Sequence, residues 1–214
     1  MNASTIRYRP VGSTLENVTN HERPPGPARE RILDVTDRLF YERGIHAVGV
    51  DTVVAEGRVA KTTLYSHFRS KDELIAAYLR RRSERWLAFV DEQLAAQGGP
   101  PADRLLRVFD LLGDWFAEPG YRGCPFINAC AEFSDADHPA SVVTREHRGR
   151  LSARFVDLAD QAGAKEPDRL AAQLMLLYDA AMVSAQIDPG LSAARTACDA
   201  ASVLLAAAVT GTPG

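Results

Sequence analysis

Apolar side chains recur every three or four residues from about residue 28 onward, which is the period of an amphipathic helix. The first such stretch ends at Gly44, where glycine suits the left-handed conformation that closes many helices. Its apolar face consists of Ile32, Val35, Leu39 and Phe40. This spacing predicts one helix that begins near residue 28 and ends just before Gly44.

Two short stretches follow, and a tight turn separates them. Residues 51–56 and 61–67 each place their apolar side chains on one face, and Gly57 lies between them. In the second stretch, Leu64 and the adjoining Phe68 are the inward-facing positions. The pattern therefore predicts two short helices joined by a turn, with the first helix packed against both.

A longer helix is predicted to begin at Ser70 and to end near Ala96. Ser70 and Glu73 form a capping box, in which the serine hydroxyl accepts from the backbone N–H of Glu73 and the glutamate reaches back to Ser70. The run Gly98-Gly99-Pro100-Pro101 stops this helix. Five further helices are predicted at 102–117, 124–133, 140–162, 167–187 and 191–209.

These elements predict an all-α fold of about nine helices with no convincing strand. We expect an N-terminal three-helix helix-turn-helix domain followed by a C-terminal helical bundle. The expected divisions are a disordered tail at 1–26, a domain at 27–87 that contains the helix-turn-helix at about 50–69, and a helical domain at 88–214.

Composition is that of an ordinary globular protein, with 46% hydrophobic and 25% charged residues in 214 positions. No apolar run is long enough to span a bilayer, and the first twenty residues lack the apolar stretch of a signal peptide, so we expect a cytoplasmic protein without membrane contact. The three cysteines, an odd number, argue against a disulfide framework.

Charge is distributed unevenly along the chain. The formal net charge is −3, but residues 1–80 hold 12 Lys/Arg and 10 Asp/Glu, and residues 57–71 hold no acidic residue at all. A basic patch on an acidic chain suits phosphate binding. A solvated charged face is the alternative interpretation.

The second short helix has the side chains that a recognition helix requires. Such a helix enters a major groove about 12 Å wide, so its outward residues must be small or polar. Lys61, Thr62 and Thr63 meet this requirement, and Tyr65 is placed to donate to a phosphate. Lys71 opens the next helix, whose N-terminal amides also favour a phosphate.

The stretch VDTVVAEGRVAKTTLYSHFRSKDELI resembles the helix-turn-helix signature of TetR-type (tetracycline-repressor-like) regulators. Thr52 matches the threonine that opens the second helix of that family, and residues 63–68 match its T-L-Y-x-H-F recognition helix. Residues 70–74 match its S-K-x-E-L segment. The close match covers about residues 28–80. The resemblance implies DNA contact by Thr52, Lys61, Thr62, Thr63, Tyr65, His67 and Lys71.

Two positions depart from the family pattern, which commonly has Ala-Gly-Val-Ser in the turn. Gly57 stands one position early, so Arg58 is expected to take the turn position that prefers positive φ. Ala60 replaces the usual serine N-cap, which costs about 1 kcal/mol of capping. These departures affect the turn and one phosphate contact.

Each proposed DNA contact has a structural alternative. Tyr65 could be a core aromatic, His67 a packing or capping residue, and Thr52 only the N-cap of its helix. For Lys61, Thr63, Tyr65 and Lys71, the resemblance favours groove or phosphate contact.

The resemblance also implies that residues 27–87 are a DNA-binding domain and residues 88–214 a ligand-binding and dimerisation domain, so that we expect a homodimer and a small-molecule effector. Two-fold pairing would place two recognition helices on successive major grooves, about 34 Å apart. The helices at 167–187 and 191–209 are the expected interface, since their alanine-rich faces permit close approach. Packing within one subunit is the alternative.

Polar groups on the apolar helix at 124–133 suggest a ligand pocket with a few orienting contacts. Asn128 and Glu132 are four residues apart and share a face. The expected pocket residues are Trp115, Phe116, Phe126, Asn128, Glu132, Tyr178 and Gln186. Alternatively, Asn128 caps a neighbouring helix and Glu132 pairs with Arg145 or Arg148.

Metal, redox and enzymatic roles have little support. Cys124 and Cys130 are spaced too loosely for a structural zinc site, and on one helix they occupy different faces, so a disulfide would require unwinding. We therefore expect no metal and no cofactor. No G-x-S-x-G, P-loop or H-E-x-x-H motif is present, so an enzyme is not expected.

The sequence thus predicts a transcriptional regulator, specifically a ligand-responsive repressor that releases a palindromic duplex operator when it binds a small molecule. The alternative is a helix-turn-helix activator, or a regulator controlled by a protein partner.

Overall fold

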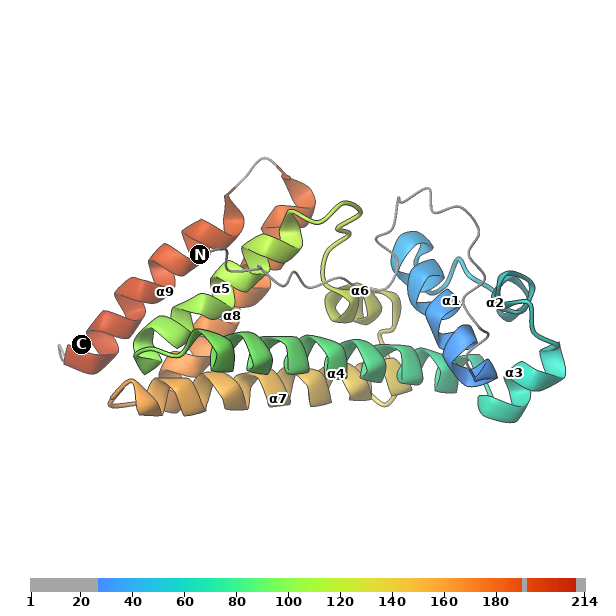
Figure 1. Ribbon diagram of the computed structural model, residues 1–214, viewed down its shortest axis with the longest axis horizontal. Helices are drawn as coiled ribbons and strands as arrows, with labels where there is room; N and C mark the ends of the chain where they lie inside the picture. Colours follow the sequence, from blue (N-terminus) through green and yellow to red (C-terminus); the bar gives the residue numbers. More distant parts are fainter. Residues whose placement is uncertain (1–26, 190–191, 211–214) are drawn as a thin grey trace. The chain divides into compact units, whose positions relative to one another are not determined.

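The computed structural model describes residues 27–189 and 192–210 of the chain, and within these ranges all regular structure is helical (Figure 1). The nine helices found there are α1 (Ala28–Arg43), α2 (Val50–Gly57), α3 (Lys61–His67), α4 (Lys71–Gln97), α5 (Pro101–Phe116), α6 (Pro125–Glu132), α7 (Pro139–Gln161), α8 (Pro167–Ile187) and α9 (Ala193–Thr210). The predicted all-α fold is confirmed. The tail at 1–26, with its arginines, lies outside the described residues.

The helices form two compact units, named here the head and the body. Among the described residues, the head comprises 27–83 and 125–145, and the body comprises 84–124, 146–189 and 192–210. Helices α4 and α7 each contribute residues to both units. Residues 125–145, which the sequence analysis grouped with the C-terminal domain, pack with the head.

The core of the head is built from the apolar faces of α1, α2 and α3. Ile32, Leu39, Val53 and Leu64 are fully buried, and Phe68 is 2% exposed. They are the positions that the three- and four-residue spacing selected as inward-facing. Burying such side chains stabilises the unit by about 1.5–3 kcal/mol each, and it fixes α3 against α1 and α2.

A buried ion pair ties α4 to α1 within the head. The Arg82 guanidinium donates to the Asp37 carboxylate at 2.5 Å, and both side chains are only 3% exposed. The guanidinium also lies 4.0 Å from the centre of the Tyr41 ring. Because each charge is buried, removing one partner would leave the other uncompensated.

The expected turn and cap geometries are largely present. Arg58 adopts the left-handed conformation, with φ 48° and ψ 47°, as the early position of Gly57 predicts. Ser70 accepts from the backbone N–H of Glu73 at 3.1 Å. The other half of the capping box is shifted by one residue, because the Glu73 carboxylate accepts from the N–H of Arg69 and not of Ser70.

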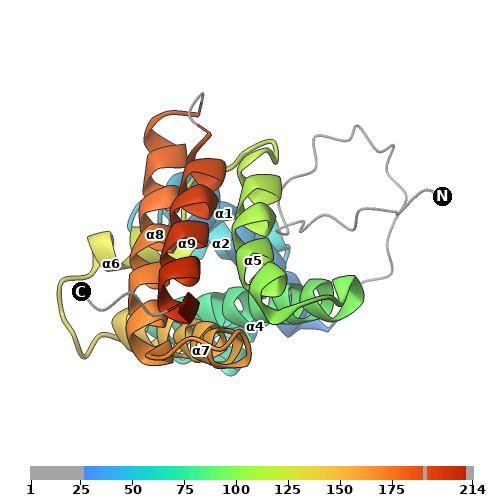
Figure 2. The same cartoon turned by 90° about the vertical axis from the view of Figure 1, so that its left-hand side faces the viewer.

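In the body, α9 packs against α8 and α5, and the three helices lie side by side (Figure 2). Their contact faces are rich in alanine, leucine and aromatic residues, among them Leu105, Phe109 and Ala201, which are fully buried. Helices α7 and α4 are joined by Arg154, whose guanidinium binds the Asp91 carboxylate through two hydrogen bonds of 2.7 and 2.5 Å.

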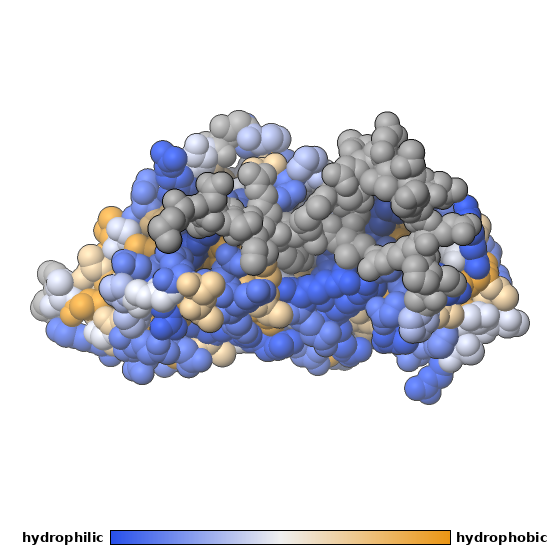
Figure 3. Space-filling view, viewed as in Figure 1, coloured by the Kyte–Doolittle hydropathy of each residue, from blue (hydrophilic) through white to orange (hydrophobic). Residues whose placement is uncertain are grey.

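The outer faces of α8 and α9 remain apolar. On α8, Leu176, Val183 and Ile187 are 67%, 37% and 79% exposed, and on α9 Val203 is 69% exposed. In Figure 3, orange residues interrupt the blue surface at the end of the molecule where Figure 1 places α9. We refer to these four residues as the apolar stripe.

Helices α8 and α9 are also long and apolar enough to cross a membrane, by length and composition alone. This differs from the expectation that no segment would meet that criterion. The reason is that a helix rich in alanine and leucine keeps a high mean hydropathy even when it contains a few single polar residues. Such a result is weak evidence, because core helices of soluble proteins meet the same test.

Candidate nucleic-acid interface

Helix α3 presents a polar face and anchors itself through one buried side chain. Leu64 is its only buried residue, whereas Lys61 and Thr62 are exposed and Thr63 is half-buried. Tyr65 is 43% exposed, so it is not the core aromatic that the alternative interpretation proposed. This face provides an ammonium, hydroxyls and a phenol on a helix narrow enough for a major groove.

Lys61 already has a partner on the same surface. Its ammonium lies 2.7 Å from the Asp51 carboxylate, and both side chains are largely exposed. The hydrogen bond to Asp51 raises the pKa of Lys61 above its ordinary value, so the side chain stays charged. An exposed pair of this kind is weak, so another anion can replace the carboxylate.

Thr52 and His67 lie at the margins of the α3 face. Thr52 is half-buried in the first turn of α2, and Gly49, not Thr52, is the N-cap of that helix. His67 is the last residue of α3 and is exposed, with its ring 6.4 Å from that of Phe68. DNA contact by Thr52 and by His67 stays a prediction.

Lys71 is turned inward, which differs from its expected exposure to phosphate. Its ammonium donates to the backbone carbonyl of Ile45 at 2.7 Å and lies 5.9 Å from the centre of the Phe40 ring. The carbonyl oxygen and the face of the ring both carry negative electrostatic potential, which stabilises the ammonium. In this arrangement Lys71 is a link between α4 and the loop after α1.

Two arginines that the sequence analysis did not select as DNA contacts, Arg58 and Arg69, are more exposed than Lys71. The Arg69 side chain is 92% exposed and sits between α3 and α4. The Arg58 side chain is exposed too, and among the described residues it has no hydrogen-bond or ion-pair partner, while its backbone N–H donates to the Ala55 carbonyl. Their charge alone did not identify them as exposed residues. The exposure of a side chain depends on its position relative to the end of the helix, which the charge pattern does not give.

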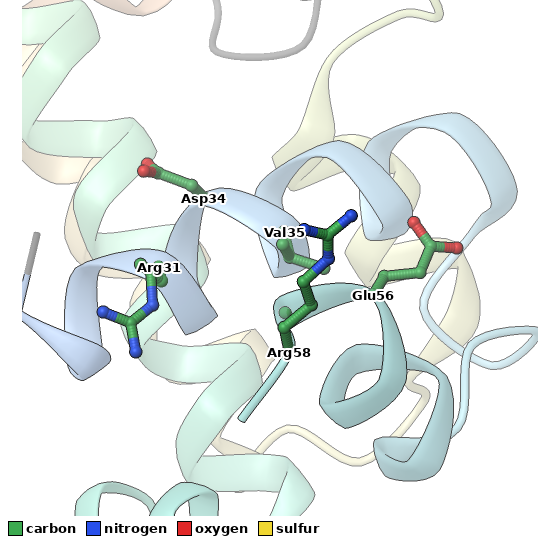
Figure 4. Close-up of a pocket in the computed structure, with 6 residues that line it drawn as sticks. Arg31, Asp34, Val35, Glu56 and Arg58 are labelled. Carbon is green, nitrogen blue, oxygen red and sulfur yellow. The ribbon is translucent and has the colours of Figure 1, made fainter. Parts of the chain in front are cut away.

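A recess of about 480 Å³ opens on the head between α1 and the end of α2 (Figure 4). Its carboxylates are already neutralised, since Asp34 pairs with Arg81 and Glu56 pairs with Arg38. The hydrogen bond from Arg38 lowers the pKa of Glu56. The recess is lined by Arg31, Asp34, Val35, Glu56, Gly57 and Arg58.

None of the seven residues expected in the ligand pocket lines this recess. Trp115 and Phe116 lie on α5, with Trp115 5.1 Å from Trp86 and 5.4 Å from Tyr121 between ring centres. Tyr178 on α8 is buried and its ring lies 6.1 Å from that of Phe155. These aromatic contacts all belong to the body.

Gln186, near the end of α8, is exposed on one side and packed on the other. Gly123, which lies against the Gln186 amide, has φ +81°, a conformation that other residues rarely adopt. Nearby, the Tyr121 hydroxyl donates to the Met182 carbonyl at 2.9 Å. The loop before α6 is thereby held against α8 within the body.

The other three expected pocket residues, Phe126, Asn128 and Glu132, lie on α6 in the head. Glu132 accepts hydrogen bonds from the backbone N–H groups of Ile45 and His46, and it is not paired with Arg145 or Arg148. Sequence reasoning missed this contact because the partners are backbone groups 87 and 86 positions away. Ligand contact by Glu132 stays a prediction.

The arginines proposed as partners of Glu132 bind elsewhere. Arg145 donates to the Ala136 carbonyl at 2.7 Å, and Arg148 pairs with Asp179 on α8. All three cysteines are free thiols, and within the described ranges no group of three or more His, Cys, Asp or Glu side chains could hold a metal ion.

Comparison with known proteins gives a consistent assignment of this architecture. The family model described as "Bacterial regulatory proteins, tetR family" matches residues 32–78, which include α2, α3 and the first turns of α4. Two solved structures resemble the chain over most of its length. A TetR-family transcriptional regulator from Streptomyces coelicolor is 31% identical, covers 85% of this chain and 96% of its own, and has a TM-score of 0.79. A TetR-type regulator from Streptomyces avermitilis is 37% identical, with coverages of 82% and 98% and a TM-score of 0.70.

Curated relatives match over a shorter span. The repressor NemR of Escherichia coli is 28% identical over 126 residues, which are 58% of this chain and 63% of that protein. The activator FasR of Mycolicibacterium smegmatis is 34% identical over 86 residues, which are 40% and 38% of the two chains. The match therefore spans less than two thirds of either relative.

Proposed function

Because this chain belongs to the TetR family of bacterial transcriptional regulators, we propose that it is a ligand-responsive repressor that releases a palindromic operator when a small molecule binds its body. DNA binding by the helix-turn-helix follows from family membership. The polar, exposed face of α3, held by the buried Leu64, is the observation that carries the DNA-reading role. We place the protein in the cytoplasm, where its DNA target lies.

Thr63 and Tyr65 are proposed as central contacts on this face, since the threonine can meet a base edge and the phenol can donate to a phosphate. Lys61, Thr62, Thr52 and His67 would contact the groove or its flanking phosphates. Arg69 extends this surface beyond the residues selected from sequence, because its guanidinium is almost fully exposed. Lys71 would join it only after leaving the Ile45 carbonyl.

A homodimer formed through α8 and α9 is the second part of the proposal. The apolar stripe exposes three large side chains on α8 and one on α9, a surface that a monomer would leave in water. An isologous two-fold interface would bury it against its own copy. Pairing of this kind also gives two recognition helices a fixed separation on the operator.

The effector is proposed to bind in the body, with Trp115, Phe116, Tyr178 and Gln186 as contacts. Aromatic walls with one amide suit a small, largely apolar molecule that needs a single orienting hydrogen bond. Helix α4 contributes residues to both units and would carry the change to the head. The ligand acts only if it binds the DNA-free arrangement more tightly than the DNA-bound one.

An activator, or a regulator governed by a protein partner, is the alternative. The relatives support both directions of control, since NemR is a repressor and FasR an activator. A reporter placed downstream of the recovered operator distinguishes a repressor from an activator, because repression lowers the reporter output and activation raises it.

Selection of duplex DNA from a random or genomic pool by the purified full chain tests the proposal. We expect a palindromic sequence whose affinity falls steeply with salt. Tyr65→Ala should weaken binding about ten- to hundredfold, and Tyr65→Phe should weaken it less, because only the hydroxyl is lost. Metabolite libraries are then screened for release of the labelled operator.

The outcomes separate the parts of the proposal. No enrichment by a folded dimer at low salt would overturn DNA reading by α3. Enrichment without release by any small molecule, together with reporter control that requires a second protein, would favour the partner-controlled alternative.

A further inference from the structure

The end of α6 holds the loop between α1 and α2 through one carboxylate. Glu132 Oε1 accepts from the backbone N–H of Ile45 at 3.0 Å, and Oε2 accepts from that of His46 at 2.6 Å. The Glu132 carbonyl lies 2.9 Å from His46 Nε2. Gly44 precedes this pair with φ +87°, a conformation that other residues rarely adopt.

The same loop is held from the other side by Lys71. Its ammonium donates to the carbonyl of Ile45, while the Ile45 side chain is 3% exposed in the core. The backbone of Ile45 is thus fixed on its N–H side by a carboxylate of α6 and on its C=O side by an ammonium of α4. We call Glu132, Ile45 and Lys71 the loop clamp.

Aromatic contacts also connect the α1–α2 loop, through the segment after α6, to the first turn of α4. The His46 ring lies 4.8 Å from Phe133, which is stacked on His138 at 3.9 Å with an interplanar angle of 8°. His138 Nε2 lies 3.4 Å from the Asp72 carboxylate. The α6–α7 connection therefore contacts both the loop after α1 and the start of α4.

The clamp joins elements with different roles. The loop at 44–49 sets where α2 begins, α2 positions α3, and Lys71 is the basic residue at the start of α4. Helix α6 follows directly on Cys124, the end of a body segment, although α6 itself packs in the head. A displacement of α6 would therefore change the contacts of the loop clamp directly, without a movement of α4.

We propose that Glu132 is a coupling residue, through which the position of α6 controls the α1–α2 loop and the availability of Lys71 to DNA. With Glu132 bound, the loop and Lys71 are held together inside the head. When α6 withdraws, the two amides lose their acceptor, the Ile45 peptide can turn, and the Lys71 ammonium exchanges its carbonyl partner. The inference rests on the proposed DNA-binding function and adds a route from α6 to it.

Coupling is reciprocal, so DNA must affect α6 if α6 affects DNA binding. The probe is therefore the operator duplex recovered by selection, and no effector is needed. Amide hydrogen exchange is measured on the full chain with and without this duplex. The variants are Glu132→Ala, Glu132→Gln, which retains one acceptor oxygen, and the control Glu146→Gln at an exposed carboxylate of α7.

Without DNA, exchange at Ile45 and His46 should be about tenfold faster in Glu132→Ala than in the wild-type protein, since a charged acceptor is lost. Glu132→Gln should lie between them, and Glu146→Gln should match the wild type. With DNA, the wild-type protein should change its exchange in residues 125–132. Glu132→Ala should still bind the duplex but lose that change.

Three results would overturn the coupling. They are unchanged exchange in residues 125–132 when DNA binds the wild-type protein, an undiminished DNA effect there in Glu132→Ala and Glu132→Gln, and wild-type exchange at Ile45 and His46 in both variants. Should Glu132→Ala fail to fold, Glu132→Gln decides the question. Failure of the wild-type protein to bind any duplex overturns the proposed function itself and is recognised by its binding curve alone.

Discussion

Two exposed surfaces of this protein have opposite chemistry. Helix α3 in the head is covered by hydroxyls, a phenol and an ammonium around one buried leucine, whereas the outer faces of α8 and α9 in the body carry the apolar stripe. Water solvates the first surface well and the second poorly. The difference indicates the partner of each: a polar, hydrogen-bonding groove for α3, and an apolar surface, proposed to be a second copy, for α8 and α9.

The largest expected effect comes from placing charges on the stripe. Leu176→Glu combined with Val203→Glu should convert the proposed dimer to a monomer, with a dimer Kd raised about a thousandfold or more, because four carboxylates would be buried per interface. Light scattering measures the mass, and operator affinity should fall with it. Ala96→Glu, an exposed position at the end of α4, is the control. A double variant that remains dimeric would exclude α8 and α9 as the dimer interface.

The two units should also respond differently to the loss of an ion pair. Asp37→Ala strands the buried Arg82 guanidinium in the head and should lower the free energy of unfolding by about 3–5 kcal/mol. Asp179→Ala in the body breaks a more exposed pair with Arg148 and should cost less than about 1 kcal/mol. Urea unfolding compares them, and equal losses would contradict the contrast.

Acid should destabilise the body through His147. Burial, together with the nearby positive charges of Arg150 and Arg154, lowers the pKa of His147 to about 3. The unfolded chain binds this proton below about pH 6.5 and the folded chain does not. The free energy of unfolding should therefore fall by up to about 1.4 kcal/mol for each pH unit between about 6.5 and 3. His147→Asn should show a shallower fall than the wild type, and parallel curves would exclude His147 as the cause.

The smallest expected effect sharpens the description of the DNA surface. Arg69→Ala should weaken operator binding about three- to tenfold and reduce the slope of log affinity against log salt by about one per subunit. Lys165→Ala, an exposed cation of the body, should leave the slope unchanged. An unaltered slope in Arg69→Ala would place that guanidinium away from the phosphates.

The fold was largely predictable because its determinants are local. The bounds of α3 and α8 match the predicted 61–67 and 167–187, and the other helices end within a few residues of expectation. Periodicity and turn residues act over one or two helical turns, so they can be identified without knowing what packs where. The positive φ of Arg58 followed in the same way from the early glycine in the turn.

The site was predictable in part. The exposed face of α3 follows from its amphipathic pattern, and Tyr65 lies on it as expected. Lys71 and Glu132 were assigned to DNA and ligand from their residue type and helix position, but both side chains bind backbone groups of the α1–α2 loop. A loop carbonyl or amide that accepts or donates such a bond leaves no trace in the sequence pattern, because every residue has both groups.

The sequence by itself determined that this chain is helical, that residues 50–69 form a helix-turn-helix, and that it resembles TetR-type regulators. Those features depend on side chains a few positions apart. Only the tertiary structure decided that α6 packs with the head and that Glu132 and Lys71 meet at Ile45, since these contacts join residues 26 and 87 positions apart. Such contacts form when helices pack, and the packing satisfies whichever polar groups it brings within reach.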